Sequence, residues 1–433
     1  MTPSPPALTD LERRVLAAID EDTLLADLAA LVATAPVGGT TGEVAVQRWC
    51  AERLRGLGLD VHEWDVDLSS EQQRPDFPGM EVERERLVAV VGTWGESHDR
   101  RQPALVLCGH TDVVPVEDRA RWRTDPFALH LAQGTATGRG VCDMLGGVAA
   151  VLAAVRAVTA AGAHATRPMA VHLVSGEEDG GVGAFATLRA GHRGDACVIA
   201  EPTGGAVIPA NAGSLTFRVE VEGRAAHGST RTLGESALDH LGVVQECLRD
   251  LESRRNAEAP DAFRHLDLVA PISIGVVRSG TWASTVPDLL VAEGRYGVLP
   301  GEGLDDARRV FEQAVSGLAG RDRWLAEHPV RVSWPGGAFA PGALPDGDAL
   351  LAETVGAVTG AGSPAPRVEG APYGSDLRHY AAHGVPTLQY GPGELRQAHA
   401  VDESVPVAEL VSCARSYALL VLRRCVAPPQ DET

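Results

Sequence analysis

Side chains that commonly bind divalent cations occur at five sites in this chain, and the first lies in Gly109-His110-Thr111-Asp112. The others, in chain order, are Asp143, the adjacent pair Glu177 and Glu178, Glu201, and His399. Two histidines and three carboxylates are enough to hold two divalent cations, and one further carboxylate is then left as a base. The sequence therefore predicts the components of metal-assisted hydrolysis.

The first site pairs a histidine with an aspartate two residues further along the chain. A neutral His110 imidazole can bind a cation, and a carboxylate that accepts a hydrogen bond from the other ring nitrogen fixes the tautomer and raises the basicity of the ligand. We therefore expect the Asp112 carboxylate to hold the His110 ring. The alternative for this pair is the polar end of an ordinary strand.

The single carboxylates and the late histidine follow turns or strand ends. Asp143 comes after a glycine-rich turn and before an expected helix, where it could bridge two cations through its two oxygens, cap the helix, or do both. Glu201 precedes Pro202, which favours an extended backbone at a strand end. His399 follows Gly391-Pro392-Gly393 in an expected loop. Each of these residues is a weak signal alone. The prediction of a metal site depends on all of them occurring together in this order.

Glu177 and Glu178 are adjacent, so their side chains would point in opposite directions from an extended backbone. In a turn after a strand the two carboxylates can instead serve two tasks, one on a metal and one on a water molecule. Paired carboxylates are also ordinary surface residues. The following Gly180-Gly181-Val182-Gly183 permits a close backbone approach and favours the site.

The elements that must position these residues alternate between strands and helices. Short apolar runs bounded by Gly, Asp or Ser predict buried strands. They are Leu87–Val91, Ala104–Leu107, Met169–Val174 and Ala196–Ala200. Apolar spacing predicts helices over 10–34 and 41–56 and after Asp143. This alternation predicts an α/β fold with a mostly parallel sheet, in which ligands bind at the carboxyl ends of the strands.

The pattern changes near Gly213, where Leu215–Val221 alternates apolar and polar residues. The following segments predict strand, helix, strand, strand, helix, strand, which is an α+β, ferredoxin-like unit. Their ranges are a helix at 235–253, strands at 272–278 and 289–298, a helix at 303–319 and a strand at 330–334. A helix at 346–359, a strand at 387–390 and a helix at 406–424 resume the first pattern. We expect a catalytic domain in two parts, 1–212 and 337–433, with a lid domain inserted at 213–336.

Composition excludes several kinds of partner. The formal charge is −20 over 433 residues with no block of Lys or Arg, which argues against nucleic acid and anionic membranes. The chain has neither a membrane-spanning apolar run nor a signal-peptide pattern at its Pro-rich start. Seven scattered cysteines indicate reduced, buried thiols in a cytoplasmic protein, including Cys108 and Cys142 beside the expected ligands. The polar segment 69–85 is interpreted as a solvated loop, with a place beside the site as the alternative.

Nearly the whole chain resembles the dizinc metallohydrolases that include acetylornithine deacetylase, succinyl-diaminopimelate desuccinylase, aminoacylase and carboxypeptidase G. The matching motifs are Gly-His-Thr-Asp-Val-Val-Pro, Gly-Arg-Gly-Val-Cys-Asp-Met, Ser-Gly-Glu-Glu-Asp-Gly-Gly-Val-Gly, Glu-Pro-Thr and the late histidine. The resemblance implies two zinc ions, replaceable by cobalt or manganese, with Asp143 bridging them. His110 and Glu201 would complete one site, Glu178 and His399 the other. Glu177 would be the general base.

The resemblance also implies residues outside the metal set. The family has a histidine in a Gly-x-Ala-Ala-His segment, which matches His227 here, and that histidine steadies the oxyanion in the active site of the partner subunit of a homodimer. Gly-Ser-Asp-Leu-Arg matches the segment whose arginine, Arg378 here, holds the substrate carboxylate. Ser284 stands where the family has an Asn that helps bind the substrate or the oxyanion, and Leu145 stands where it usually has a Lys. The acyl pocket is therefore expected to differ.

Together these features predict a cytoplasmic zinc amidohydrolase acting on an N-acyl amino acid or a related small amide. A dipeptidase or carboxypeptidase with the same site is the first alternative, because only the substrate pocket separates the two. An inactive metal-containing binding protein is the second alternative, and the presence of Glu177 argues against it.

Overall fold

The computed structural model describes residues 8–95, 102–258 and 260–426. It divides into two compact units. Unit 1 comprises residues 1–209, 343–369 and 376–433, and unit 2 comprises residues 210–342 and 370–375. The start of the Pro-rich N-terminal segment, residues 1–7, lies outside the described residues.

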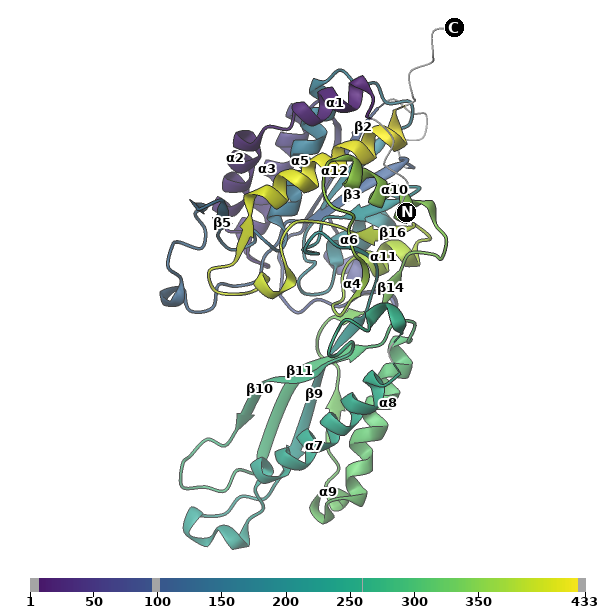
Figure 1. The fold of residues 1–433 in the computed structure, drawn as a ribbon. Helices are drawn as coiled ribbons and strands as arrows, with labels where there is room; N and C mark the ends of the chain where they lie inside the picture. Colours follow the sequence, from purple (N-terminus) through teal and green to yellow (C-terminus); the bar gives the residue numbers. More distant parts are fainter. Residues whose placement is uncertain (1–7, 96–101, 259, 427–433) are drawn as a thin grey trace. The chain divides into compact units, whose positions relative to one another are not determined.

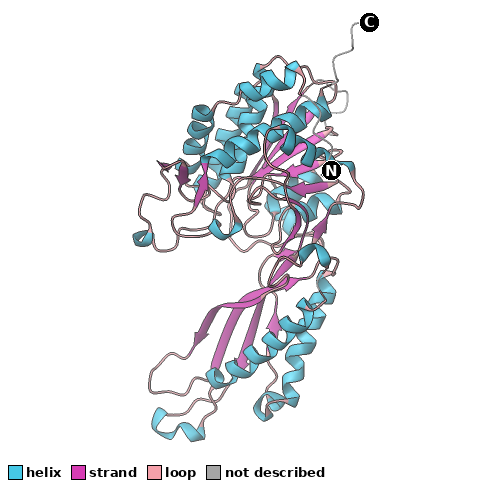
Figure 2. Cartoon of the chain, viewed as in Figure 1, coloured by secondary structure: helices cyan, strands magenta, loops and turns pink. Residues whose placement is uncertain are grey.

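Unit 1 is built on a nine-stranded sheet with the order β1-β2-β6-β3-β7-β16-β8-β14, in which β15 also pairs with β8. Strands β6, β3, β7 and β16 are parallel to their neighbours within this group, whereas β1, β2 and β8 pair in the antiparallel direction. A mostly parallel centre with antiparallel edges confirms the predicted α/β class (Figures 1 and 2). The strands of this sheet are β1 Asp60–Asp65, β2 Val88–Trp94, β3 Leu105–His110, β6 Met169–Val174, β7 Cys197–Ile199, β8 Val207–Asn211, β14 Gly342–Ala343, β15 Val368–Ala371 and β16 Thr387–Gln389.

The helices of unit 1 pack on this sheet and on one another. They are α1 Asp10–Ala17, α2 Glu21–Ala33, α3 Thr41–Gly56, α4 Leu68–Gln72, α5 Leu145–Ala160, α6 Val182–Arg189, α10 Ala349–Gly360, α11 Leu377–Ala382 and α12 Val407–Cys425. Short 3-10 turns, η1 Arg119–Arg121 and η5 Leu395–Gln397, and a small sheet of β4 His130–Ala132, β5 Thr135–Thr137 and β17 Ser404–Pro406 complete the unit.

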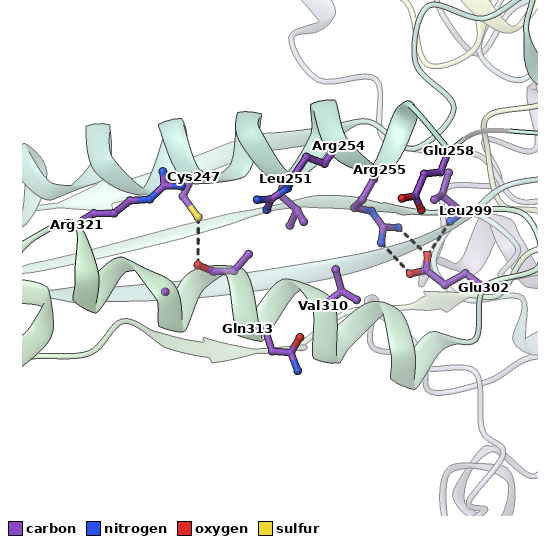
Figure 3. Close-up of a pocket in the computed structure, with 12 residues that line it drawn as sticks. Cys247, Leu251, Arg254, Arg255, Glu258, Leu299, Glu302, Val310, Gln313 and Arg321 are labelled. Carbon is purple, nitrogen blue, oxygen red and sulfur yellow. Dashed lines mark hydrogen bonds and ion pairs between the residues drawn. The ribbon is translucent and has the colours of Figure 1, made fainter.

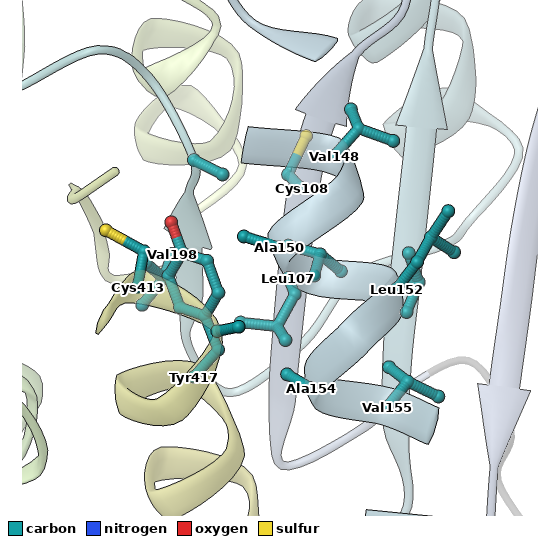
Figure 4. Close-up of a cluster of buried hydrophobic side chains, with 14 of the residues drawn as sticks. Leu107, Cys108, Val148, Ala150, Leu152, Ala154, Val155, Val198, Cys413 and Tyr417 are labelled. Carbon is teal, nitrogen blue, oxygen red and sulfur yellow. The ribbon is translucent and has the colours of Figure 1, made fainter. Parts of the chain in front are cut away.

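Helix α5 forms the centre of the core of unit 1. It contacts α2, α12 and β3, and Figure 4 shows its Val148, Ala150 and Leu152 in one buried cluster with Leu107 and Cys108 of β3 and Tyr417 of α12. Its small residues let it approach the sheet closely, since a Cβ atom at Gly147 would lie only 2.2 Å from the Ala200 carbonyl oxygen. The packing therefore fixes the first turn of α5, which follows Asp143, against the end of β7, which precedes Glu201.

Two sequence predictions in unit 1 were wrong in detail. The single helix expected over 10–34 is two helices, because Asp20 caps α2 by accepting a hydrogen bond from the Thr23 amide and so begins a new helix. Strand β1 was missed. Its sequence Asp-Val-His-Glu-Trp-Asp is mostly polar, because β1 is a partly exposed edge strand that pairs only with β2.

Unit 2 is an antiparallel sheet with the order β10-β11-β9-β12, with β13 also on β9. Its strands and helices follow the predicted order strand, helix, strand, strand, helix, strand, which confirms the ferredoxin-like prediction. The elements are β9 Gly213–Glu222, η2 Gly228–Leu233, α7 Ala237–Asn256, η3 Asp261–Phe263, β10 Ile272–Ser279, β11 Leu289–Val298, α8 Leu304–Ser316, η4 Gly317–Gly320, α9 Arg323–Glu327, β12 Arg331–Ser333 and β13 Ala338–Phe339.

A surface groove of about 590 Å³ lies between α7 and α8 of unit 2 (Figure 3). Its floor is apolar, with Leu251 and Val310, and its charged groups are partly paired. Arg255 donates two hydrogen bonds to Glu302, at 2.8 and 2.7 Å, and a third to the Gly297 carbonyl. The pair serves the packing of unit 2, because Glu302 also accepts a hydrogen bond from the backbone at the end of β11.

Candidate metal centre

The five predicted ligands and the predicted base come together in unit 1. His110 ends β3, Glu177 and Glu178 follow β6, and Glu201 follows β7, so all four lie at the carboxyl ends of parallel strands. Asp143 precedes α5, and His399 lies in the loop before β17. This is the place at which ligands bind in open parallel sheets.

Asp143 lies at the centre of the cluster with its two oxygens facing opposite sides. Its Oδ1 is 3.1 Å from Nε2 of His110, and its Oδ2 is 3.5 Å from Nε2 of His399. Glu201 lies on the first side, with Oε2 3.9 Å from the same His110 nitrogen. Glu178 lies on the second side, with Oε2 2.9 Å from Nε2 of His399. The geometry thus provides two adjoining sets of donors that share one carboxylate.

These groups are the right kind to hold cations. His110, Asp143 and Glu178 offer ligand atoms that all lie within 4.8 Å of one another. Oε1 of Glu178 is buried and has no hydrogen-bond partner among the described residues. A buried carboxylate oxygen without a partner is costly unless a cation is bound there. The donor set of imidazole and carboxylate suits zinc and related divalent ions.

Electrostatics support the same interpretation. Burial, together with the charges of Glu201 and Asp376, raises the pKa of Glu177 well above its usual value. Burial raises the pKa of Glu201 to about 8, in spite of the opposing effect of His110. Burial and the nearby Asp143 also raise the pKa of Glu178. Divalent cations would offset this crowding of negative groups and return the ligands to their charged forms.

The Asp112 carboxylate does not make the expected hydrogen bond to the His110 ring. Nδ1 of His110 lies 3.0 Å from the backbone carbonyl of Asp112, whereas the nearest carboxylate oxygen of Asp112 is 3.7 Å away. The carboxylate instead accepts hydrogen bonds from the amides of Glu177 and Glu178, both at 3.2 Å. The His110 ring is still oriented with Nε2 toward Asp143, and the Asp112 side chain holds the paired glutamates.

The capping role considered for Asp143 is also not what the structure shows. Helix α5 begins at Leu145 with Met144 as its N-cap residue, and no side chain caps it. The loop before α5 is held by Glu403 instead, which accepts hydrogen bonds from the amides of Gly140, Cys142 and Asp143 at 2.9–3.0 Å.

Glu403 is paired with Arg139, and both side chains are 1% exposed. Arg139 also donates to the carbonyl oxygens of Ala400 at 3.3 Å and His399 at 3.5 Å. The pair therefore ties the backbone at Asp143 to the backbone at His399, although these residues are far apart in the sequence. His399 itself has a φ of 62°, in the left-handed region, so its loop needs this support.

The segment 69–85 contains a short helix and ends beside the site, so its interpretation as a solvated loop was wrong at its C-terminal end. Arg84 is 1% exposed and contacts Asp179, which follows the paired glutamates. A Cβ atom at Gly180 would lie 2.2 Å from the Gly79 carbonyl oxygen, so this segment packs directly on the glutamate-bearing loop.

Arg378 is buried on the other side of that loop. One of its terminal nitrogens donates to the Gly180 carbonyl oxygen at 2.6 Å. Burial lowers the pKa of Arg378 to about 10, so the guanidinium remains charged at neutral pH. A Cβ atom at Gly181 would lie 2.9 Å from the same nitrogen, which explains the glycine at that position.

His227 and Ser284 lie in unit 2, close to each other. An isolated β-bridge joins His227 to Thr285, and the Gly228 amide donates to the Ser284 carbonyl at 2.7 Å. Both side chains are exposed. Nδ1 of His227 is 2.7 Å from the Ser229 hydroxyl. Two residues that the sequence placed in separate motifs therefore share one exposed end of unit 2.

All seven cysteines are unpaired and buried, as predicted for structural thiols. Cys142 donates a weak hydrogen bond to the Glu394 carbonyl at 3.4 Å, and burial raises the pKa of its thiol. A thiol that stays protonated is a poor metal ligand. Cys142 is therefore a packing residue beside the site, and Cys108 is buried in the hydrophobic core.

Comparison with known proteins agrees with this geometry. Residues 106–423 match the sequence model of the family described as peptidase family M20/M25/M40. An N-formyl-4-amino-5-aminomethyl-2-methylpyrimidine deformylase of Halalkalibacterium halodurans is 27% identical, over 95% of this chain and 97% of its own. A succinyl-diaminopimelate desuccinylase of Stenotrophomonas maltophilia is 31% identical, over 80% of this chain and 91% of its own.

Solved structures show the same fold. The dipeptidase Dug1p of Saccharomyces cerevisiae matches with a TM-score of 0.76 at 15% identity, covering 95% of this chain and 98% of its own. Human carnosine dipeptidase 1 matches with a TM-score of 0.71 at 16% identity, covering 95% and 99%. The chain belongs to peptidase family M20/M25/M40. It is a metallohydrolase that acts on amide bonds, as the resemblance of its sequence motifs implied.

No helix in the part of the chain that the structure describes combines the length and the apolar character needed to cross a membrane.

Proposed function

We propose that this protein is a dinuclear zinc amidohydrolase that removes the acyl group from a small N-acyl amino acid or related amide. His110 and Glu201 would hold one zinc ion, Glu178 and His399 would hold the other, and the Asp143 carboxylate would be shared between them. Cobalt or manganese can replace zinc at such sites. The observation that carries the proposal is the division of the two Asp143 oxygens between the two histidines.

Two zinc ions in this centre would polarise the carbonyl of the scissile amide and acidify the attacking water. Glu177 takes the proton from that water and passes it to the leaving nitrogen. Its raised pKa, caused first by burial, suits a group that must accept and then release a proton near neutral pH. The Glu177 amide is held by Asp112, so this carboxylate starts from a fixed position.

Substrate contacts are proposed for three further residues. Arg378 holds the substrate carboxylate through a guanidinium that stays charged although it is buried. His227 stabilises the oxyanion in the partner subunit's site, a contribution worth about 3 kcal/mol in comparable sites. Ser284, beside His227 in unit 2, contacts the acyl group.

A homodimer through unit 2 is part of this proposal. Strand β10 lies at the edge of its sheet and exposes Val276 and Val277, which are 38% and 45% exposed. An apolar edge strand is a natural site for pairing with a second chain.

The absence of disulfides among seven buried thiols supports the proposal of a cytoplasmic location.

The deacylase is favoured over the dipeptidase by the relatives that align over most of the chain. A deformylase and a desuccinylase both remove acyl groups, as their names state, and they are 27% and 31% identical. The dipeptidases found among the solved structures are only 15% and 16% identical, which supports the fold and not the substrate.

A substrate screen tests the proposal. Protein reconstituted with zinc or cobalt is assayed against N-formyl, N-acetyl and N-succinyl amino acids, an N-formyl aminomethylpyrimidine and a panel of dipeptides. We expect the highest kcat/KM on an acylated amine. Hydrolysis confined to dipeptides would replace the proposed deacylase with the dipeptidase. Stoichiometric binding without turnover of any amide would favour a binding protein.

A further inference from the structure

A buried arginine lies between two carboxylates directly behind the loop that carries Glu177. Nε of Arg84 donates to Glu43, with both carboxylate oxygens at 3.0 Å. The two terminal nitrogens donate to the two oxygens of Asp179, at 2.8 and 2.7 Å. Side-chain exposure is 1% for Arg84, 2% for Glu43 and 7% for Asp179. The three side chains therefore form a buried network of hydrogen bonds.

This network is connected to the glutamate-bearing loop, residues 175–181, at both ends. Oε1 of Glu43 accepts a hydrogen bond from the Ser175 hydroxyl at 3.0 Å, at the start of the loop. Asp179, near its end, also accepts hydrogen bonds from the amides of Glu81 and Val82 at 3.0 and 2.8 Å. A Cβ atom at Gly176 would lie 3.3 Å from the Arg84 guanidinium, so the loop backbone rests on this side chain.

The front of the same loop is held by the Asp112 carboxylate, which accepts from the amides of Glu177 and Glu178. The loop thus lies between a carboxylate on the metal side and a guanidinium on the far side. An arginine suits the position of Arg84, because its planar guanidinium can donate hydrogen bonds to two carboxylates in fixed directions. A lysine is a single point charge and cannot make the same set of contacts.

We infer that Arg84 is a positioning residue for catalysis, which holds Glu177 in register with the metal centre by fixing the loop 175–181 against segment 79–84. The inference rests on the proposed role of Glu177 as the general base. The carboxylates that accept hydrogen bonds from Arg84 among the described residues, Glu43 and Asp179, are not proposed metal ligands. Small displacements of a catalytic group are costly, since an error of about 1 Å can reduce the rate by about 100-fold.

The test compares Arg84→Lys and Glu43→Gln with Arg255→Lys in the folded, metal-loaded enzyme. Arg255 is a matched control, because it is 7% exposed and also pairs bidentately with a glutamate, Glu302, in unit 2. We expect Arg84→Lys and Glu43→Gln to lower kcat by about 10-fold to 100-fold with KM within about 2-fold. Bound metal per chain should stay unchanged. Arg255→Lys should lower Tm without lowering kcat.

A double-mutant cycle with Glu177→Gln provides the decisive readout. If Arg84 acts through Glu177, Arg84→Lys should change kcat by less than about 2-fold in the Glu177→Gln background. An equal fractional loss in both backgrounds would overturn the inference, as would loss of bound metal from Arg84→Lys. If Arg84→Lys and Arg255→Lys lower kcat equally at the same loss of Tm, Arg84 only stabilises the fold. Undiminished kcat in Glu177→Gln alone would instead overturn the base assignment, and the inference with it.

Discussion

At the scale of single residues, the site depends on carboxylates that are close in space but differ in task. Asp143 faces both histidines, Glu178 faces His399, and Glu177 adjoins the cluster with its backbone held by Asp112. In the proposed function, adjacent residues of one loop would therefore serve the metal and the water separately. The turn after β6 makes this possible, because an extended strand would send the two side chains apart.

Glu177→Gln tests the division between ligand and base. The substitution keeps the size of the side chain and removes its ability to accept a proton, so kcat should fall by about 100-fold or more. Metal content, measured by elemental analysis, should remain that of the wild type. A variant that binds much less metal would show that the tasks of Glu177 and Glu178 are exchanged.

Arg378→Lys tests the proposed contact with the substrate carboxylate. A lysine retains the charge but loses the two parallel hydrogen bonds, so KM for carboxylate substrates should rise by roughly 10-fold or more. The matched substrates are the corresponding carboxamides, for which KM should change little. If both rise equally, the contact with the Gly180 carbonyl is the whole role of Arg378.

The clustering of the proposed ligands could be predicted from the sequence, because imidazoles and carboxylates of the required number follow strand ends in order. The residues that hold them could not. Glu403 acts on backbone amides at 140–143, about 260 positions away, and shows no pattern of its own. Arg84 lies in a polar segment whose composition resembles a solvated loop. Contacts between a side chain and a distant backbone leave no periodicity or motif to detect.

At the scale of elements, the turn before α5 is the part that most needs external support. The amides of Gly140, Cys142 and Asp143 all donate to Glu403, and α5 itself contributes no cap. This arrangement resembles an oxyanion-binding loop built around a protein carboxylate. The position of Asp143 therefore depends on Glu403, which directly precedes β17.

Glu403→Gln should weaken metal binding without unfolding the chain. An amide offers one oxygen where the carboxylate offers two, and its NH2 group would face backbone N–H donors. We expect metal affinity to fall by about 10-fold to 100-fold, the usual effect of groups that orient ligands. Competition with a zinc chelator measures this affinity. Unchanged affinity would show that the loop keeps its shape without Glu403.

Element prediction succeeded where periodicity was strong and failed at boundaries set by single contacts. The runs of β3, β6 and β7 are mainly apolar and are buried as predicted, although β6 also includes His172. The break between α1 and α2 depends on one capping aspartate within an otherwise continuous helical pattern. Strand β1 belongs to the sheet only through its pairing with β2, which is a tertiary contact.

At the scale of the whole molecule, the proposal requires two chains. His227 lies on an exposed end of unit 2, whereas the metal ligands all belong to unit 1. A histidine donated by the partner subunit would complete each site, and closure around the substrate would exclude water.

Mixing two inactive variants tests this arrangement. Glu177→Gln and His227→Ala homodimers should each be nearly inactive, and heterodimers should regain one working site of the two, because that site has Glu177 from its own chain and His227 from the other. Separate affinity tags verify the heterodimer. Failure to recover activity in verified heterodimers would place His227 in its own chain's site or outside catalysis.

The number and position of the bound metals is the measurement closest to the central claim. A crystal structure of the zinc-loaded protein, with an anomalous map at the zinc edge, reports both at once. The proposal predicts two peaks about 3.5–4 Å apart, one beside His110 and Glu201 and the other beside Glu178 and His399, with Asp143 between them. A single fully occupied peak, or two peaks that Asp143 does not bridge, would contradict it.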